Sequence, residues 1–462
     1  MAALWRYPLS LFKGGDGAGD NRRNVKWLDG LRGIASVIVI LTHLARAWDY
    51  DLFFSKSHPD ATPRILQWPI LRIPWQGRIG VTIFAFLTGY VCALKPLKLA
   101  WAGNHEAAFS SVSKSAFRRP PRLILPATLA MVIAWTVAQL GGFTVGNRAD
   151  ADWIRYASPN LEDSFLKELV RLFRVFRTTW TNGHMDYDDH QWAMLPLLKG
   201  SMMIYVVLCA TMYVQYRYRL VVYSIMFAYF WQHPGPDTVQ ELTTVETFGQ
   251  QFFFGMFLSD MANDQQTQKF IASLGWSRRI FCATLALVGL FVASFPGERP
   301  EFCGWSRFLL DVAGVIFPNG VNLGKRFSAL GLDLIIIAIY ISPSTKSFLS
   351  KRLFLFLGRN SFAVYLVHGT LLRVVLTWMI YGISGQPWVY TKNKDGEIVP
   401  PAWLPRGGPM TFAISIPIWI AIVYTVAHLW TTYVDSFCAR LTHRVEQHVF
   451  EQQEKQPESL PL

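Results

Sequence analysis

The chain has 462 residues, of which 52% are hydrophobic and only 16% are charged. Soluble domains average about 25% charged residues, so the composition argues against a row of soluble domains and indicates one polytopic membrane domain. The net charge of +13 does not indicate a nucleic-acid partner, because the basic residues cluster beside apolar runs, as they do on the cytosolic side of membrane spans.

Ten mostly apolar runs predict membrane-spanning helices, which need about 20 residues each. The expected fold is an all-α, polytopic transmembrane bundle of about ten helices. It is flanked by a cytosolic N-terminal segment, 1–30, and a cytosolic tail, 434–462, whose end, 451–462, is polar and expected to be disordered. The transmembrane domain, 31–433, contains runs at 31–48, 77–95, 123–143, 195–213, 218–232, 247–260, 279–296, 328–343, 361–382 and 411–433, with 306–318 as a candidate partial or re-entrant helix.

The basic clusters predict the orientation. All of them fall on one side of the membrane if the N-terminus is cytosolic, and the loop 144–194 is then lumenal. The first 26 residues make a poor signal peptide, so the first span is expected to insert and stay. The clusters are Arg22, Arg23 and Lys26; Lys114, Arg118, Arg119 and Arg122; Arg217 and Arg219; Arg278 and Arg279; and Lys346, Lys351 and Arg352.

The first span contains two strongly polar side chains, Arg32 and His43, in an otherwise apolar run. Their spacing of eleven residues is three helical turns plus roughly 20°, so both lie on one face, about 16 Å apart. Ionisable groups in a membrane span usually mark a functional site. The alternative is a buried histidine bonded to a neighbouring helix and an arginine that reaches the interface.

The long loop 144–194 contains a predicted amphipathic helix that begins near Asn160, with Asn160 as its cap. Such a helix suits either the membrane interface or a lid packed on the bundle. Its expected apolar stripe is Phe165, Leu169, Leu172 and Phe176, surrounded largely by Lys167, Arg171, Arg174 and Arg177.

A polar cluster just before the fourth span holds three carboxylates and two histidines within seven residues. Carboxylates and imidazoles beside an apolar pocket suit general acid and base catalysis, although a solvated loop would also explain them. Their spacing fits no standard metal site, and the five cysteines form no CxxC pair, so no metal and no disulfide framework are expected. The cluster comprises His184, Asp186, Asp188, Asp189 and His190, followed by Trp192.

Two further groups stand out. The cytosolic group Lys114, Arg118, Arg119 and Arg122 suits phosphate recognition, although a basic flank explains part of it. Late in the chain, Ser361, Tyr365 and His368 fall on one helix face, which either lines a cavity or joins helices.

Taken in chain order, these motifs resemble the acyltransferase-3 family of integral membrane acyltransferases, and most closely its fungal branch, which often acts in secondary metabolism. The resemblance covers most of the chain. It rests on Leu28-Asp-Gly-Leu-Arg-Gly33 with His43, Phe84-Ala-Phe-Leu-Thr-Gly-Tyr90, Arg118-Arg-Pro-Pro-Arg122 with Pro126, and Leu357-Gly-Arg-Asn-Ser361 through Tyr365 and His368.

The resemblance implies an acyl-CoA-dependent O-acyltransferase in an endomembrane such as the endoplasmic reticulum. Acetyl-CoA is the expected donor, a lipophilic natural product such as a terpenoid or polyketide is the expected acceptor, and membrane lipids surround the protein. In this interpretation Arg118, Arg119 and Arg122 hold the CoA phosphates, Arg32 guides the thioester, and His43 is the general base. Asp188, Asp189 and His190 are further catalytic candidates, and Trp192, Ser361, Tyr365 and His368 are expected to line the substrate pocket.

One departure from the family pattern leaves alternatives open. The family carries a Trp-Thr-x-Pro-x-Glu run at the start of the fourth span, whereas this chain has Ala193 at the threonine position and Leu197 at the glutamate position. Loss of the carboxylate favours a repurposed fold that cyclises or isomerises a metabolite without CoA, while the retained arginines favour acyl transfer. A transporter is the third possibility, although transport would predict internal repeats and none is evident.

Overall fold

The computed structural model describes residues 25–233, 246–382, 391–392, 396–399 and 402–450. Most of the expected N-terminal segment and the expected disordered tail, 451–462, lie outside these residues. Apart from loops and turns, the described part is helical except for one antiparallel hairpin of β1 (Thr391–Lys392) and β2 (Ile398–Val399). All five cysteines are described and free, as expected.

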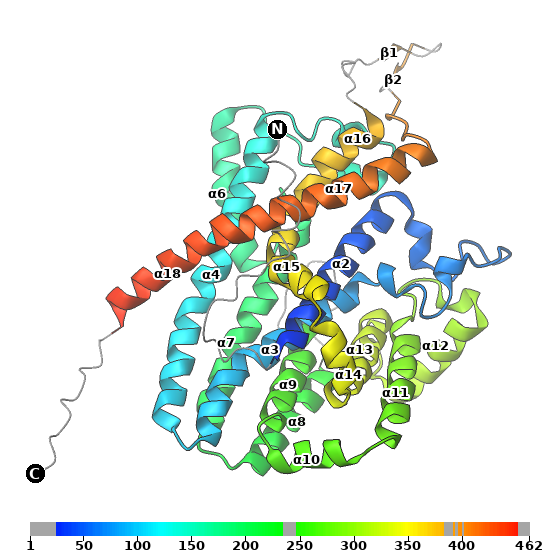
Figure 1. Ribbon diagram of the computed structural model, residues 1–462. Coiled ribbons are helices and arrows are strands. Elements are labelled where there is room, and N and C mark those ends of the chain that lie inside the picture. Colours follow the sequence, from blue (N-terminus) through cyan, green and yellow to red (C-terminus); the bar gives the residue numbers. More distant parts are fainter. Residues whose placement is uncertain (1–24, 234–245, 383–390, 393–395, 400–401, 451–462) are drawn as a thin grey trace, which may run out of the picture.

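One group of helices surrounds the functional residues. In Figure 1, α3, α4 and α7 run alongside one another, while α17 and α18 cross their face as one long diagonal rod. Helix α2 packs against α15, and α3 packs against α9 and α7. The bounds of this group are α2 (Lys26–Trp48), α3 (Gly77–Trp101), α4 (His105–Gln139), α7 (Met194–Thr211), α15 (Arg352–Leu371), α17 (Pro409–Leu429) and α18 (Ser436–Val449).

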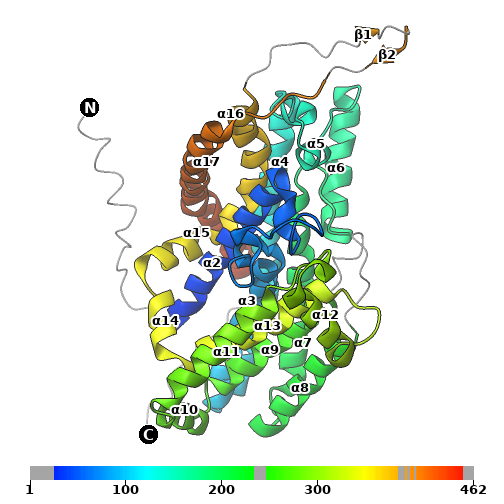
Figure 2. The ribbon, with the colours of Figure 1, turned by 90° about the vertical axis from the view of Figure 1, so that its right-hand side faces the viewer.

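A second group lies beside the first, and α9 and α13 connect the two through α3. Figure 2 shows these helices together below the loop that carries α5 (Asp152–Ala157) and α6 (Phe165–Thr181). Their bounds are α8 (Tyr216–Gln232), α9 (Glu246–Met261), α10 (Gln265–Ser273), α11 (Ser277–Ala293), α12 (Gly304–Ile316), α13 (Leu323–Ile341) and α14 (Pro343–Leu349). Short helical turns complete the described chain: η3 (Tyr50–Phe53), η4 (Ile65–Gln67), η5 (Ile73–Trp75), η6 (Gly146–Arg148), η7 (Asp189–Ala193) and η9 (Pro300–Phe302).

Every predicted span coincides with a helix, but the count of about ten membrane crossings is not confirmed. Among the described residues, six helices are long and apolar enough to cross a bilayer, and the number rises to eight if two sharply bent helix pairs each count as one span. Helices α8 and α9, with 17 and 16 residues, lie outside this set. A helix rises about 1.5 Å per residue, so these two are short for a bilayer core of about 30 Å.

Glycines let α2 and α15 cross at very short range. A Cβ added at Gly33 would lie 2.7 Å from the backbone nitrogen of Gly358, and one added at Gly358 would collide with the carbonyl oxygen of Asp29. Real side-chain carbons do not approach backbone atoms so closely. The glycines of these two sequence motifs therefore bring Arg32 on α2 and Ser361 on α15 to the walls of one cavity.

Both long C-terminal rods contain a π-helical turn. Helix α15 continues through η10 (Leu372–Leu376) into α16 (Thr377–Tyr381), and α17 continues through η11 (Trp430–Asp435) into α18. Such turns are rare and often occur at functional sites; here they carry Arg373 and Asp435. The predicted boundary at residue 433 falls inside this second rod, which stays helical to Val449.

The lumenal-loop prediction needs two corrections. Helix α6 (Phe165–Thr181) begins five residues after Asn160, and its cap is Ser164, whose hydroxyl accepts a hydrogen bond from the Lys167 amide at 3.4 Å. A separate helix, α5 (Asp152–Ala157), precedes it. The face of α6 packed on the bundle carries Glu168, Val175 and Thr179, whereas Phe165 and Phe176 of the expected stripe are exposed. Helix α6 runs alongside α4 (Figure 2), so its inner face packs as a lid would.

Candidate active site

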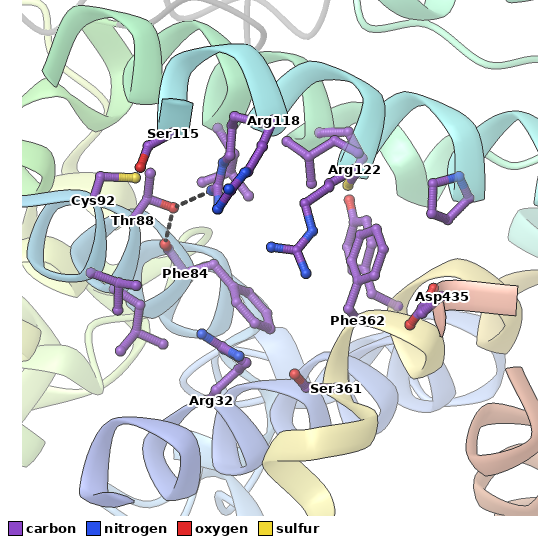
Figure 3. A pocket seen from close by; sticks show the side chains of 18 of the residues that line it. Arg32, Phe84, Thr88, Cys92, Ser115, Arg118, Arg122, Ser361, Phe362 and Asp435 are labelled. Atoms are coloured by element: carbon purple, nitrogen blue, oxygen red, sulfur yellow. Dashed lines mark hydrogen bonds between the residues drawn. The ribbon is translucent and has the colours of Figure 1, made fainter. Parts of the chain in front are cut away.

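A cavity of about 480 Å³ lies where α2, α3, α4, α7 and α15 meet η11 and the start of α18. Arg118, Arg119 and Arg122 lie within about 100° of arc on α4, because residues four apart nearly superimpose on a helix. Figure 3 shows Arg122 reaching into the space from α4 and Arg32 reaching in from α2 on the opposite wall. The polar lining is Arg32, Thr88, Lys95, Ser115, Arg118, Arg119, Arg122, Ser361, Tyr365 and Asp435.

The four predicted arginines are brought together, but they differ in their partners. Arg118 forms a two-point ion pair with Glu446 of α18, at 2.5 and 2.6 Å. Arg119 donates to the hydroxyl of Thr88 at 3.4 Å, and Arg32 lies 3.6 Å from Asp29. Arg118 is therefore tied to the C-terminal helix. Within the described part of the chain, the one hydrogen bond of Arg119 is a long bond to a neutral hydroxyl, which a phosphate could replace.

Three histidines from distant parts of the chain converge beyond this cavity. They are His43 on α2, His190 in η7 and His368 on α15. The ring centroids lie 3.9 Å apart for His43 and His190, 4.9 Å for His190 and His368, and 5.3 Å for His43 and His368. His190 and His368 are buried, while His43 is partly accessible.

A buried carboxylate orients one of these imidazoles. The Oδ1 atom of Asp188 lies 2.6 Å from Nδ1 of His190 and also accepts a hydrogen bond from Arg373 at 3.0 Å. Burial alone would raise the pKa of Asp188, but its contacts with the His190 imidazole and the Arg373 guanidinium outweigh it and lower this pKa from 3.8 to about 2. Asp188 is thus ionised at neutral pH. Gly369 makes room for the pair, since a Cβ there would collide with both side chains.

Tyr365 connects the cavity to the histidines. Its side chain lines the cavity, its ring lies 6.1 Å from that of His368, and its hydroxyl donates to the backbone carbonyl of His190. The same hydroxyl accepts from the Ala193 amide at 3.3 Å. The side chain of Tyr365 therefore contacts the arginine-lined cavity on one side and the histidine cluster on the other.

The other predicted site residues lie elsewhere. Asp189 is exposed, in contrast to its buried neighbour Asp188. Trp192 stacks on Phe248, with centroids 6.1 Å apart, and is absent from the cavity lining. Leu197, at the position where the resemblance expects a glutamate, does line the cavity. Within the predicted polar loop, Asp188 and His190 form one buried pair, and the other polar residues lie outside the histidine cluster.

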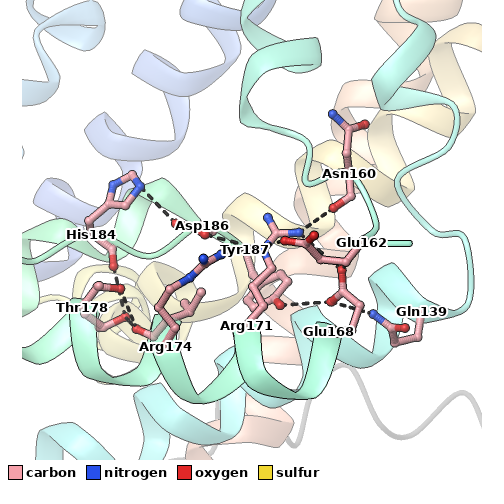
Figure 4. Close-up of polar contacts among 12 residues, drawn as sticks. Gln139, Asn160, Glu162, Glu168, Arg171, Arg174, Thr178, His184, Asp186 and Tyr187 are labelled. Atoms are coloured by element: carbon pink, nitrogen blue, oxygen red, sulfur yellow. Dashed lines mark hydrogen bonds and ion pairs between the residues drawn. The ribbon is translucent and has the colours of Figure 1, made fainter. Parts of the chain in front are cut away.

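Asp186 and His184 belong to a separate network in the loop 144–194, which is predicted to be lumenal. This group is called the lumenal network after that prediction. Asp186 lies 3.0 Å from His184 and 3.5 Å from Arg171 of α6. Figure 4 shows these side chains beside Glu168, whose carboxylate accepts from the hydroxyl of Tyr187 at 3.2 Å. This network docks α6 and holds the segment before Asp188 in place.

The sequence-based interpretation missed two residues. Arg373 is fully buried and donates to Ala157, Tyr187 and Gly369 carbonyls as well as to Asp188. A signal was available, because an arginine inside the apolar run 361–382 is as unusual as His43 in the first span. Trp153 of α5 stacks on His43, with centroids 5.7 Å apart and ring planes at 18°. No sequence pattern marked this tryptophan.

Comparison of the sequence with known protein families identifies a matching family. The family model described as an acyltransferase domain, acyltransferase-3, matches residues 25–427, which includes every residue of the histidine cluster and all four cavity arginines. This chain belongs to the acyltransferase-3 family. The resemblance drawn from the sequence motifs is therefore confirmed, and the several apolar helices agree with a membrane-associated family.

Three curated fungal proteins are similar to this chain. O-acetyltransferase PaAT-1 of Phomopsis amygdali is 26% identical over 395 residues, covering 76% of this chain and 73% of that protein. Acyltransferase clz18 of Cochliobolus lunatus is 22% identical, covering 89% and 93%. Acyltransferase R4 of a Phoma species is 24% identical, covering 78% and 86%. No solved structure matches the chain.

Proposed function

We propose that this protein is an acyl-CoA-dependent O-acyltransferase that acylates a hydroxyl group of a lipophilic natural product, such as a terpenoid or polyketide. One observation carries the proposal: an arginine-lined cavity and a buried histidine cluster lie on the two sides of Tyr365. The names of the similar fungal proteins support acyl transfer, and PaAT-1 is named as an O-acetyltransferase. We propose acetyl-CoA as the donor and an endomembrane, such as the endoplasmic reticulum, as the location.

In this proposal the donor binds from the basic side. Phosphate groups of CoA pair with Arg119 and Arg122, since guanidinium groups suit phosphate oxygens, while Arg32 on the opposite wall faces the thioester arm. Arg118 holds α18 against α4 through Glu446 and so keeps one wall of the cavity closed.

The acceptor meets the histidine cluster. His43, the most accessible of the three imidazoles, takes the proton from the acceptor hydroxyl, and the acceptor oxygen then attacks the thioester carbonyl. The C–S bond of the thioester breaks, and the CoA sulfur leaves with the proton that His43 carried. The positive charge that develops on His43 is stabilised by the Asp188 carboxylate, which lies on the far side of His190. This buried acid takes the place of the carboxylate that the family pattern has at position 197, where this chain has leucine.

The proposal is tested with purified protein, labelled acetyl-CoA and the hydroxylated metabolites of its source. A product heavier by one acetyl group that forms only with the donor supports acyl transfer. An isomeric product formed without CoA would instead support the repurposed fold that Leu197 allows.

The donor site is tested by binding of acetyl-CoA. Arg119→Ala and Arg122→Ala should each weaken binding by about 10–100-fold, the range for a lost hydrogen bond to a charged group. Lys114→Ala is the matched control, because Lys114 lies on the same helix outside the cavity lining. Equal affinity in all three variants would contradict the assignment of the CoA phosphates to this cavity.

A further inference from the structure

The histidine cluster has the arrangement of a metal site with three imidazole ligands. The candidate ligand nitrogens of His43, His190 and His368 all lie within 4.8 Å of one another. Zinc bound by three histidines has Zn–N distances of about 2.0–2.1 Å, so its ligand nitrogens stand roughly 3.5 Å apart. The observed cluster therefore needs only small side-chain rotations to surround one ion.

In His190 and His368, one ring nitrogen makes hydrogen bonds within the protein, and the other ring nitrogen stays free to bind a metal ion. Metal-ligating histidines usually donate their other ring N–H to a carboxylate or a backbone carbonyl. His190 meets this requirement through Asp188, 2.6 Å from its Nδ1. His368 meets it through the carbonyls of Val364 and Tyr365, 2.9 and 3.0 Å from its Nδ1.

The inward nitrogens have no hydrogen-bond partner. Among the described residues, Nε2 of His190 and Nε2 of His368 are buried without one, and so is Nδ1 of His43. A buried polar atom without a partner costs free energy, so such atoms in a native structure call for an explanation. Three such atoms on three converging rings are explained together by one shared ion.

The charges around the cluster are compatible with a divalent cation. Asp188 supplies a buried negative charge next to His190. Two positive charges act on the cluster: Arg46 of α2, which is exposed, and Arg373, whose guanidinium is held by the Ala157 and Tyr187 carbonyls and by Asp188. Imidazole ligands suit borderline ions such as zinc rather than magnesium or calcium, which prefer oxygen.

We propose that His43, His190 and His368 form a binding site for one divalent transition-metal ion of the zinc class, with Asp188 as the outer partner that orients His190. Three protein ligands leave a fourth position for water or a hydroxyl oxygen. The sequence alone gave no reason to expect a metal, because the three ligands come from three separate helical elements with no ligand spacing between them.

The site has a consequence for catalysis that rests on the proposed function. An imidazole that donates its lone pair to zinc cannot take a proton from a hydroxyl group. Zinc is therefore expected to inhibit acyl transfer reversibly, and a chelator is expected to restore it.

The binding test uses purified full-length protein stripped with a chelator and then titrated with Zn²⁺ or Co²⁺. Wild-type protein should retain one equivalent of zinc after desalting, and its Co²⁺ form should show the visible absorption of a tetrahedral nitrogen site. Asp188→Asn should weaken zinc binding by about 10–100-fold, as loss of an outer partner does. His368→Gln and His190→Gln should lose stoichiometric binding.

A control histidine separates the cluster from general metal adsorption. His184→Gln should bind zinc as the wild type does, because His184 is exposed, with 68% of its side chain accessible, and lies in the separate lumenal network. Thermal melting of each variant shows whether it is folded. Absence of stoichiometric zinc in folded wild-type protein would overturn the proposal, and so would equal binding in wild type and His368→Gln.

The activity arm keeps the two proposals apart. If chelator-treated protein transfers acyl groups and added zinc inhibits this transfer, both the metal site and the proposed function are supported. Zinc binding in a protein without acyl transfer would leave the metal site standing and overturn the proposed function. Activation by zinc would support the site and overturn the role of His43 as a free base.

Discussion

Asp188 and Asp189 are adjacent in the chain, yet only Asp188 is buried against an imidazole. A buried carboxylate in contact with a histidine and an arginine serves to orient and charge-stabilise the ring, whereas an exposed one is solvated. The two neighbouring carboxylates of this short loop therefore have different surroundings, and we expect only Asp188 to take part in the proposed reaction.

We expect Asp188→Asn to lower acyl transfer by about 10²–10⁴-fold, the range for groups that take part in positioned proton transfer. Asn cannot carry the charge that Arg373 and His190 face. Asp189→Asn should change the rate at most several-fold. The measurement is initial rate under saturating donor, and similar losses in both variants would contradict the geometric distinction.

The stabilising effect of Asp188 should also depend on pH. Its pKa in the folded protein is about 2, below the ordinary 3.8, so its contribution to stability is fully present above about pH 4 and is lost as pH falls toward 2. The difference in melting temperature between wild type and Asp188→Asn should be constant from pH 5 to 8 and shrink below pH 4. A difference that already shrinks between pH 7 and 5 would contradict this.

We expect His43→Gln to lower turnover by about 10²–10⁴-fold with little change in acyl-CoA affinity, because glutamine fills similar space but takes no proton. His184→Gln is the control, since His184 belongs to the separate lumenal network. The measurements are the turnover rate and the acyl-CoA affinity of both variants. Full activity in His43→Gln would show that His43 is a structural residue and not the general base.

At the scale of elements, the site depends on how closely α2 and α15 approach. Gly33 and Gly358 lie at their crossing, and each backbone occupies the space that a side chain on the other would need. The arginine of one motif and the serine and tyrosine of the other consequently line the same cavity. The close crossing of the two helices therefore places both motifs on the walls of the proposed donor site.

Two glycine substitutions should have opposite effects. Gly358→Ala should destabilise the protein by about 1–3 kcal/mol, the usual cost of overpacking. Gly314→Ala, in α12 with no atom within 4 Å of the added Cβ, should stabilise it by up to about 1 kcal/mol. Thermal melting of both purified variants provides the comparison, and a tolerated Gly358→Ala would show that the crossing is not tight.

At the scale of the whole molecule, the orientation in the membrane decides which side supplies each substrate. If the predicted topology holds, the basic cavity faces the cytosol and the lumenal network around α6 faces the lumen. That topology, with both termini cytosolic and the loop 144–194 lumenal, stays a prediction.

Single substitutions test the orientation, because the chain contains no Asn-x-Ser/Thr acceptor of its own. Glu162→Thr creates an acceptor at the exposed Asn160, and Pro457→Asn creates one in the tail. Expressed in a eukaryotic host, the first should gain a glycan that a glycosidase removes, and the second should not. The reverse pattern would invert the assignment of both ends.

The sequence by itself determined where the helices lie and which family the chain belongs to. Long apolar runs can satisfy their backbone hydrogen bonds in lipid only as helices, so each predicted span coincides with one. Arg32, Arg118, Arg119 and Arg122 were found in the same way, because motifs with short spacings put charged groups on a defined helix face.

Only the tertiary structure decided which polar groups meet. The convergence of His43, His190 and His368 has no local signature, because contact between distant elements depends on how closely helices cross rather than on spacing along the chain. The contact between Arg373 and Asp188 likewise joins residues far apart in the chain and has no local signature. The exposure of Asp189 depends on the turn of η7, which the sequence does not specify either. The predicted count of about ten membrane crossings is not confirmed, since short apolar helices serve equally well as spans or as packing inside the bundle.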